Sequence, residues 1–119
     1  MKIGIVSGLL LCLTAFNVCA QTFTQSEFKD LFLAAFSYHT VARVCRDSDS
    51  IEKSAAVLRR VVNFGNYKNI LSNEAKAYLR NPAEMIARGE EQYRKNRYVG
   101  CGQSKEIIEK LDQSTKQLP

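Results

Sequence analysis

Cysteine supplies the first candidate for chemistry in this sequence. Cys101 stands between two glycines in the stretch RYVGCGQ, which covers residues 97–103. A thiol presented on a tight turn is a candidate nucleophile, whereas a thiol with a second cysteine within reach is a candidate disulfide. Of the four cysteines, Cys12 and Cys19 fall in an apolar N-terminal stretch that we expect to be removed. The remaining pair, Cys45 and Cys101, predicts one disulfide, which restricts the unfolded chain by roughly 4 kcal/mol because it closes a long loop.

Histidine supplies the second candidate. His39 is the only histidine of the chain and lies in an apolar stretch. A general base needs a nucleophile or an orienting carboxylate within hydrogen-bond reach, and the residues three and four positions away on a helix supply neither. We therefore interpret His39 as a buried polar residue satisfied by a hydrogen bond. A ligand-contacting or pH-sensing role, and a pairing with Cys101 as in a small thiol hydrolase, are the less favoured alternatives.

The sequence offers one weak resemblance to a metal-binding motif. Asp47 and Asp49 resemble the start of a calcium loop, but Glu52 and Leu58 occupy the positions where an EF-hand needs glycine and glutamate. The sequence contains no HExxH, CxxC, P-loop or dinucleotide fingerprint. One histidine and two paired cysteines make a structural zinc site unfavourable. We therefore predict no catalytic, cofactor-binding or metal-binding residues, and a protein that is not an enzyme.

A basic segment with interleaved tyrosines is the candidate binding face. With 17 Lys and Arg against 12 Asp and Glu, the net charge of +5 is mildly basic and permits an acidic partner without demanding one. Such a face suits phosphate groups, anionic lipid headgroups or an acidic protein. The alternative is a solvated helix face, because three glutamates dilute its charge. The face consists of Arg88, Tyr93, Arg94, Lys95, Arg97 and Tyr98.

The N-terminal segment predicts where the protein acts. Lys2 precedes an apolar run over residues 3–16, and small residues follow at Val18 and Ala20. This pattern predicts a cleavable secretory signal over residues 1–20 and a single domain over 21–119. The run is short for a bilayer, which needs about 20 apolar residues, so we expect no transmembrane segment after signal removal. The chain lacks an N-glycosylation sequon, which favours a bacterial periplasmic or secreted protein, and export argues against a nucleic-acid partner.

Helical spacing and capping signals account for the whole of the expected domain, and the predicted N-caps are Thr24, Asp49, Ser72 and Asn81. Residues 31–42 contain no charged side chain, so the first helix should be buried at the centre of the fold. Gly65-Asn66 is expected to end the second helix, and Gly100 the fourth. Cys101 would then lie in the turn before the last helix. The five predicted helices cover residues 25–45, 50–64, 73–80, 82–98 and 104–117. We expect Leu79 in the third helix to pack inward, and Asp112 in the fifth to lie outside with Lys116.

The sequence therefore predicts an all-α protein, a compact bundle of about five helices with a buried central first helix and one disulfide. We expect an exported non-enzymatic protein that acts through protein–protein interaction, as inhibitors, immunity proteins and chaperones do. The general plan is similar to that of helical periplasmic immunity proteins of interbacterial secretion systems, in size, signal and disulfide alone. The alternative is a secreted effector or ligand-binding protein that engages an anionic phosphate or lipid surface, and a small hydrolase is less favoured.

Overall fold

The computed structural model describes residues 23–119, and the predicted signal over residues 1–20 lies outside them. Five helices form this part of the chain, and it contains no strand, so the predicted all-α bundle is confirmed. No helix among residues 23–119 is long and apolar enough to span a bilayer. The helices are α3 (Gln25–Cys45), α4 (Ser48–Lys68), α5 (Asn73–Arg80), α6 (Pro82–Lys95) and α7 (Cys101–Thr115).

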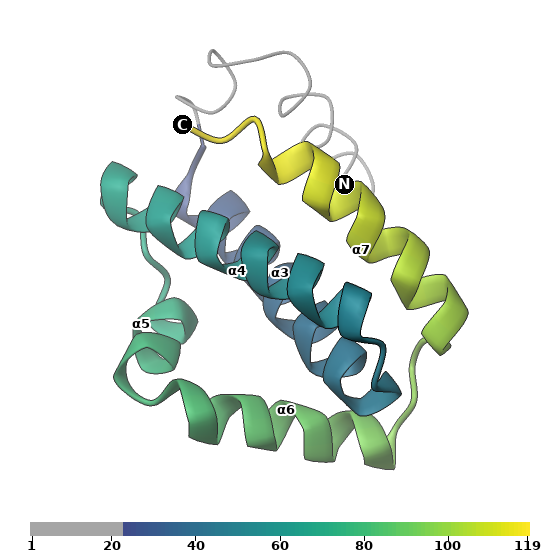
Figure 1. Cartoon of the computed structure of the whole chain (residues 1–119). Helices are drawn as coiled ribbons and strands as arrows, with labels where there is room; N and C mark the ends of the chain where they lie inside the picture. The colour runs from purple at the N-terminus through teal and green to yellow at the C-terminus, as the bar shows by residue number, and fades with distance from the viewer. Residues whose placement is uncertain (1–22) are drawn as a thin grey trace.

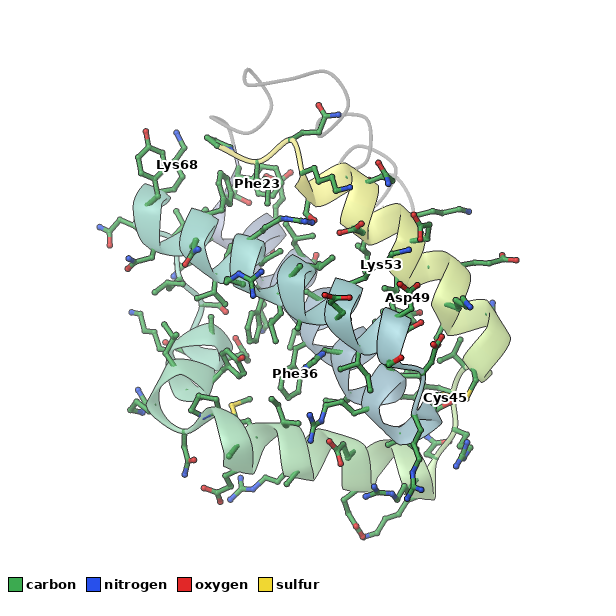
Figure 2. All side chains as sticks on the ribbon, in the orientation of Figure 1. Phe23, Phe36, Cys45, Asp49, Lys53 and Lys68 are labelled. Atoms are coloured by element: carbon green, nitrogen blue, oxygen red, sulfur yellow. A yellow bond between two sulfur atoms is a disulfide. The ribbon has the colours of Figure 1, made fainter. Side chains whose placement is uncertain are left out.

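The helices are arranged around α3. Figure 1 shows α3 and α4 as an antiparallel pair across the middle of the molecule, with α7 along one side and α5 and α6 along the other. Each of the other four helices contacts α3, which confirms the prediction of a central first helix. Ion pairs join α4 to α7, and Figure 2 shows Asp49 and Lys53 on the side of α4 that faces α7. Lys53 bonds Glu109 of α7 there.

Two apolar clusters of different size hold the bundle together. The larger one, called the main core below, lies between the N-terminal half of α3 and α4, with Ala75 of α5 added. The rings of Phe28, Phe32 and Phe36 stack on successive turns of α3, with centroids 6.4 and 5.9 Å apart. The smaller one, the corner cluster, consists of buried Val41, Tyr93 and Val99 at the C-terminal end of α3.

Local capping signals set the starts of α3, α5 and α6 as predicted. The Thr24 hydroxyl accepts from the Glu27 amide at 3.1 Å, and the Glu27 carboxylate accepts from the Thr24 amide at 2.8 Å. This reciprocal pair satisfies two amides that the first turn of α3 leaves without partners. The Ser72 hydroxyl caps α5 at 3.2 Å in the same way. Asn81 caps α6, which begins at Pro82.

The predicted bounds of α4 are wrong at both ends. The helix begins at Ser48, because Asp47 rather than Asp49 is its N-cap residue. It runs through Gly65, which is buried inside the helix, and the residue with a left-handed backbone at its end is Asn69, with φ of 60°. Gly65 is needed for space: a Cβ atom there would lie 2.3 Å from the ring of Phe28. The glycine therefore lets α3 approach α4 closely and does not end the helix.

The boundary between α6 and α7 also differs from the prediction. Helix α6 ends at Lys95, and α7 begins at Cys101 with Gly100 as its N-cap, so Gly100 starts one helix rather than ending another. Cys101 is the first residue of α7 and does not lie in the preceding turn. The intervening turn is fixed by a tertiary contact, because the buried Tyr93 hydroxyl donates to the Val99 carbonyl.

Candidate functional site

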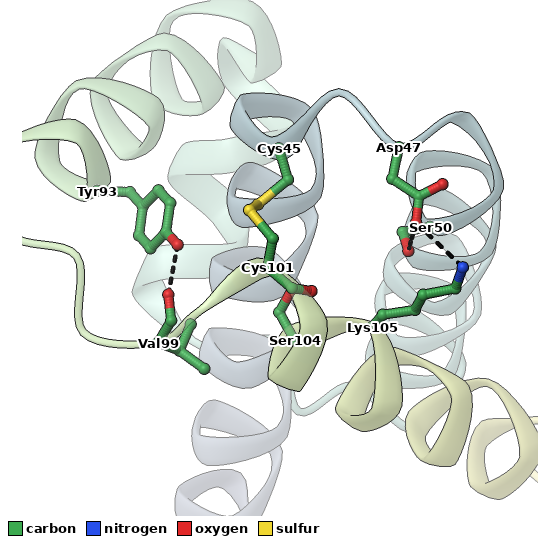
Figure 3. Close-up of a disulfide and its surroundings, with 8 residues drawn as sticks. All are labelled: Cys45, Asp47, Ser50, Tyr93, Val99, Cys101, Ser104 and Lys105. Carbon is green, nitrogen blue, oxygen red and sulfur yellow. Dashed lines mark hydrogen bonds and ion pairs between the residues drawn. A yellow bond between two sulfur atoms is a disulfide. The ribbon is translucent and has the colours of Figure 1, made fainter.

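The disulfide clasps the end of α3 to the start of α7. Cys45 and Cys101 are joined over a sequence separation of 56 residues, with Cα atoms 5.9 Å apart, as the sequence predicts. Figure 3 shows the bond beside the start of α7, where the Ser104 hydroxyl donates to the Cys101 carbonyl. The Cys101 sulfur is committed to this bond. In the oxidised protein it is therefore not a nucleophile for His39.

Polar contacts reinforce the corner around the disulfide. The carboxylate of Asp47, in the turn between α3 and α4, accepts from the Ser50 hydroxyl at 2.8 Å. The ammonium of Lys105, on α7, lies 3.8 Å from the same carboxylate (Figure 3). The Ser50 hydrogen bond lowers the pKa of Asp47, and the charge of Lys105 adds to this effect. The first turns of α4 and α7 are thus tied together next to the covalent bond.

The predicted basic face is largely neutralised by its own glutamates. Arg88 pairs with Glu84, Arg94 with Glu90 and Lys95 with Glu91, each across one turn of α6. Glu90 also accepts from Arg43 of α3, which anchors α6 to the central helix. Arg97 is the member of this face that forms no ion pair among residues 23–119. Its guanidinium carbon lies 5.3 Å from the centroid of the Tyr93 ring.

The two tyrosines of that face have different environments. Tyr93 is fully buried, and its ring fills the corner cluster, so it adds no exposed surface to this face. Tyr98 is 54% exposed and meets Tyr93 edge-on, with centroids 5.3 Å apart. The four cationic residues and Tyr98 are exposed, and their role as a binding face stays a prediction.

His39 is buried and hydrogen-bonded, and its partner comes from the neighbouring helix. Its Nδ1 lies 2.8 Å from the Ser54 hydroxyl oxygen. The single Ser54 hydroxyl hydrogen is donated to the Ile51 carbonyl at 3.1 Å, so we assign the shared proton to His39 Nδ1. Nε2 then keeps its lone pair and makes no hydrogen bond within the described chain. Burial lowers the pKa of His39, as does Arg43, while Glu90 opposes them, and the ring is held neutral.

A cavity of about 360 Å³, which we name the α4–α5 recess, opens beside His39. Leu58 and Val62 of α4 and Tyr78 of α5 supply its apolar walls, and Arg59 stands at its edge. Leu79 also lines it, and 49% of this residue is exposed, although the sequence predicted that it packs inward. The recess was not predicted, because Leu79 was expected to pack inward with the rest of α5.

Two adjacent arginines of α4, Arg59 and Arg60, have different environments. Arg60 donates to the Asp112 carboxylate of α7 at 2.8 Å and to the Thr115 hydroxyl at 3.1 Å. The Asp112 side chain is only 7% exposed, so the prediction that it lies outside with Lys116 is wrong, although Lys116 does pair with it at 3.6 Å. Arg59 is exposed and forms no ion pair among residues 23–119. It is therefore available to a partner.

The described residues do not gather three or more histidine, cysteine, aspartate or glutamate side chains as a metal site would. Comparison with known protein families, with curated proteins and with solved structures finds no match for this chain. Fold and site together define a small helical bundle closed by one disulfide, with an open recess beside a buried histidine.

Proposed function

We propose that this chain is an exported, non-enzymatic binding protein that recognises another protein through the α4–α5 recess. The observation that carries the proposal is that one cavity is lined both by half-exposed Leu79 and by Arg59, which forms no ion pair within residues 23–119. Protein interfaces favour this combination of an apolar pocket and an arginine. The proposed occupant is a loop of the partner that carries an apolar side chain next to a carboxylate.

The interior of the recess sets the complementary chemistry. Its apolar walls favour an aliphatic or aromatic side chain, and its volume of about 360 Å³ is in the range of small binding pockets. Arg59 can hold the partner's carboxylate with two parallel hydrogen bonds. Nε2 of His39 can accept a hydrogen bond from a hydroxyl or amide of the same loop, because its proton is on Nδ1.

Two features of the chain support export, namely its N-terminal segment and its disulfide. The apolar segment over residues 1–20 has the pattern of a secretory signal. The Cys45–Cys101 bond is the kind that persists in an oxidising compartment such as the bacterial periplasm. The alternative function, binding to an anionic surface through the basic face, has weaker support because three of its four cationic side chains pair with glutamates on the same helix.

Site-specific photo-crosslinking in the native cell envelope tests the proposal. A photoreactive residue at position 79 should give a discrete adduct with one protein, because Leu79 lines the recess. The matched control is position 67, because Tyr67 is 70% exposed and lies outside the recess. Equal adducts from both positions, or none from position 79, would contradict the proposed recess.

Charge reversal then identifies the surface that matters. Arg59→Glu should weaken binding of the captured partner by about 30-fold, as expected for a central arginine of an interface. Arg88→Glu is the matched control, because it makes the same charge change on the exposed basic face. If Arg88→Glu weakens binding and Arg59→Glu does not, the basic face is the interface and the proposed recess is wrong.

A further inference from the structure

A second cavity, which we name the α3–α6 recess, lies between the central helix and the C-terminal half of α6. It measures about 240 Å³. Phe36, labelled in Figure 2, and Ser37 line it from α3, while Gln92 and Asn96 line it from α6 and its C-cap. Tyr98 closes one edge. The recess is separate from the α4–α5 recess, since the two have no lining residue in common.

Close helix packing forms one wall of this recess. A Cβ atom on Gly89 would lie 2.7 Å from the Thr40 methyl carbon and 3.3 Å from the Phe36 ring. The absence of that atom lets the backbone of α6 approach α3 there. Both Gly89 and Thr40 line the recess. The cavity is thus framed by regular helices on two sides, which favours a fixed shape.

The lining contains no charged side chain. Helix α6 is rich in glutamate, arginine and lysine, yet none of these residues faces the recess. What lines it instead are aromatic rings, carboxamides and hydroxyls. A charged ligand would lose hydration here without gaining an opposite charge, which is unfavourable. The composition therefore points to an uncharged ligand that makes many hydrogen bonds.

The polar groups that such a ligand needs are available. The carboxamides of Gln92 and Asn96 are one helical turn apart and make no side-chain hydrogen bond among residues 23–119. Each carboxamide both donates and accepts, which matches the hydroxyl groups of a sugar. Tyr98, a residue that is 54% exposed, adds an aromatic ring held edge-on against Tyr93. Flat C–H surfaces of a sugar ring can pack on such a face.

We propose that the α3–α6 recess binds one uncharged sugar ring, such as a terminal hexose or N-acetylhexosamine of a glycan. The volume of about 240 Å³ is below the roughly 300–1,000 Å³ of pockets for drug-sized ligands, so it suits one ring. The proposal does not depend on the protein partner proposed above. Loss of one activity leaves the other testable, because the two recesses are lined by different residues.

Nuclear magnetic resonance titration of residues 21–119 with glucose and, separately, with N-acetylglucosamine tests the site. At least one sugar should bind with a dissociation constant of about 1–10 mM, and the shifted amide signals should belong to residues around the recess. Binding of only the acetylated sugar would assign the acetamido group as part of the recognised ligand. Shifts with neither sugar at about 50 mM, or shifts confined to other surfaces, would overturn the proposal.

Two substitutions locate the binding. Tyr98→Ala and Gln92→Leu should each weaken sugar binding at least about tenfold, the loss expected for about 1.4 kcal/mol of contacts. Tyr67→Ala is the matched control, because it removes another exposed tyrosine ring that lies outside the recess. Thermal unfolding of each variant should show that the fold is intact. Unchanged binding in both recess variants would overturn the proposed site, even if sugar binding itself is observed.

Discussion

The two ends of α3 are held in different ways. Its N-terminal half lies in the main core, where Phe28 and Phe32 are fully buried against α4. Its C-terminal end lies in the corner cluster, where only Val41, Tyr93 and Val99 are buried together. The disulfide, the Tyr93–Val99 hydrogen bond and the Asp47–Lys105 ion pair all lie at this second end. Covalent and polar contacts are therefore concentrated where apolar burial is smallest.

This difference has a physical reason. The main core joins helices that are neighbours in sequence and long enough to bury a continuous face. The corner joins the end of α3 to a short irregular turn and the first turn of α7, which offer few apolar side chains. A cross-link that closes a long loop has its largest effect on such a distant contact, because it removes conformations from the unfolded chain.

The largest effect is expected from truncation in the main core. Phe32→Ala should lower the free energy of unfolding by about 4 kcal/mol, because it removes a fully buried ring and leaves a cavity. Urea unfolding followed by circular dichroism measures this change. Leu79→Ala, at a half-exposed position, is the control and should change stability by about 0.5 kcal/mol or less. Similar losses in both variants would mean that the main core does not dominate stability.

Removal of the disulfide should have the next largest effect. The double substitution Cys45→Ser and Cys101→Ser should cost about 3 kcal/mol, slightly less than the loop-entropy model predicts for 56 residues. Hydrogen exchange should become faster around Tyr93 and at the start of α7, while amides near Phe32 stay protected. A uniform increase in exchange across both ends of α3 would contradict the view that the disulfide stabilises the corner cluster more than the main core.

The buried pair between α4 and α7 ranks third. Asp112→Ala should cost about 2 kcal/mol, because Arg60 would lose its carboxylate at 2.8 Å while 30% of the arginine side chain stays in contact with water. Glu91→Ala provides the comparison, since it breaks an exposed pair with Lys95 and should cost about 0.5 kcal/mol or less. Chemical denaturation of both variants decides whether burial accounts for the difference.

Loss of one hydroxyl in the corner should be smaller. Tyr93→Phe keeps the buried ring but removes the hydrogen bond to the Val99 carbonyl, at a cost of about 1 kcal/mol. The same substitution in the protein without the disulfide measures whether the two contacts act together. Equal costs in both backgrounds would show that the hydrogen bond and the disulfide stabilise the corner independently.

The smallest expected effect is a pH dependence from His39. Burial lowers the pKa of His39 below its ordinary value of 6.5, so the unfolded chain binds this proton before the folded chain does. The contribution of neutral His39 to the free energy of unfolding is therefore fully present above about pH 6.5. It is lost as the pH decreases from the ordinary pKa to the lower pKa of the folded state. His39 is the only histidine, so unfolding curves of wild type and His39→Gln between about pH 7.5 and 5.5 isolate its contribution. Identical slopes would show that His39 titrates normally.

Local signals in the sequence were enough to predict the order of the helices and several of their starts. Thr24, Ser72 and Asn81 act on amides only three residues away, so their pattern is readable without tertiary structure. The absence of charge over residues 31–42 likewise predicted the central helix. The disulfide followed from the number of cysteines expected to remain after export.

Features that depend on distant residues were missed. Gly65 is a residue type that commonly ends helices. Its role here is instead to leave space for the Phe28 ring of another helix. The sequence predicted Asp112 as an exposed partner of Lys116, whereas the fold also places Arg60 beside it. It did not identify Ser54, on the neighbouring helix, as the hydrogen-bond partner of His39. Both recesses are also tertiary features, because each is lined by residues from at least two helices.

The Cys45–Cys101 bond has a topological consequence. It makes a covalent ring that contains α4, α5 and α6, with α3 and α7 attached as tails at the closure point. A protease that cuts one peptide bond inside the ring, for example in the exposed connector over residues 96–98, opens the ring without separating the two pieces. Exposed connectors are preferred cutting sites, so a nicked molecule would keep the segments of both recesses on one covalent unit. Outside the cell's reducing interior, a single cut would leave this protein assembled.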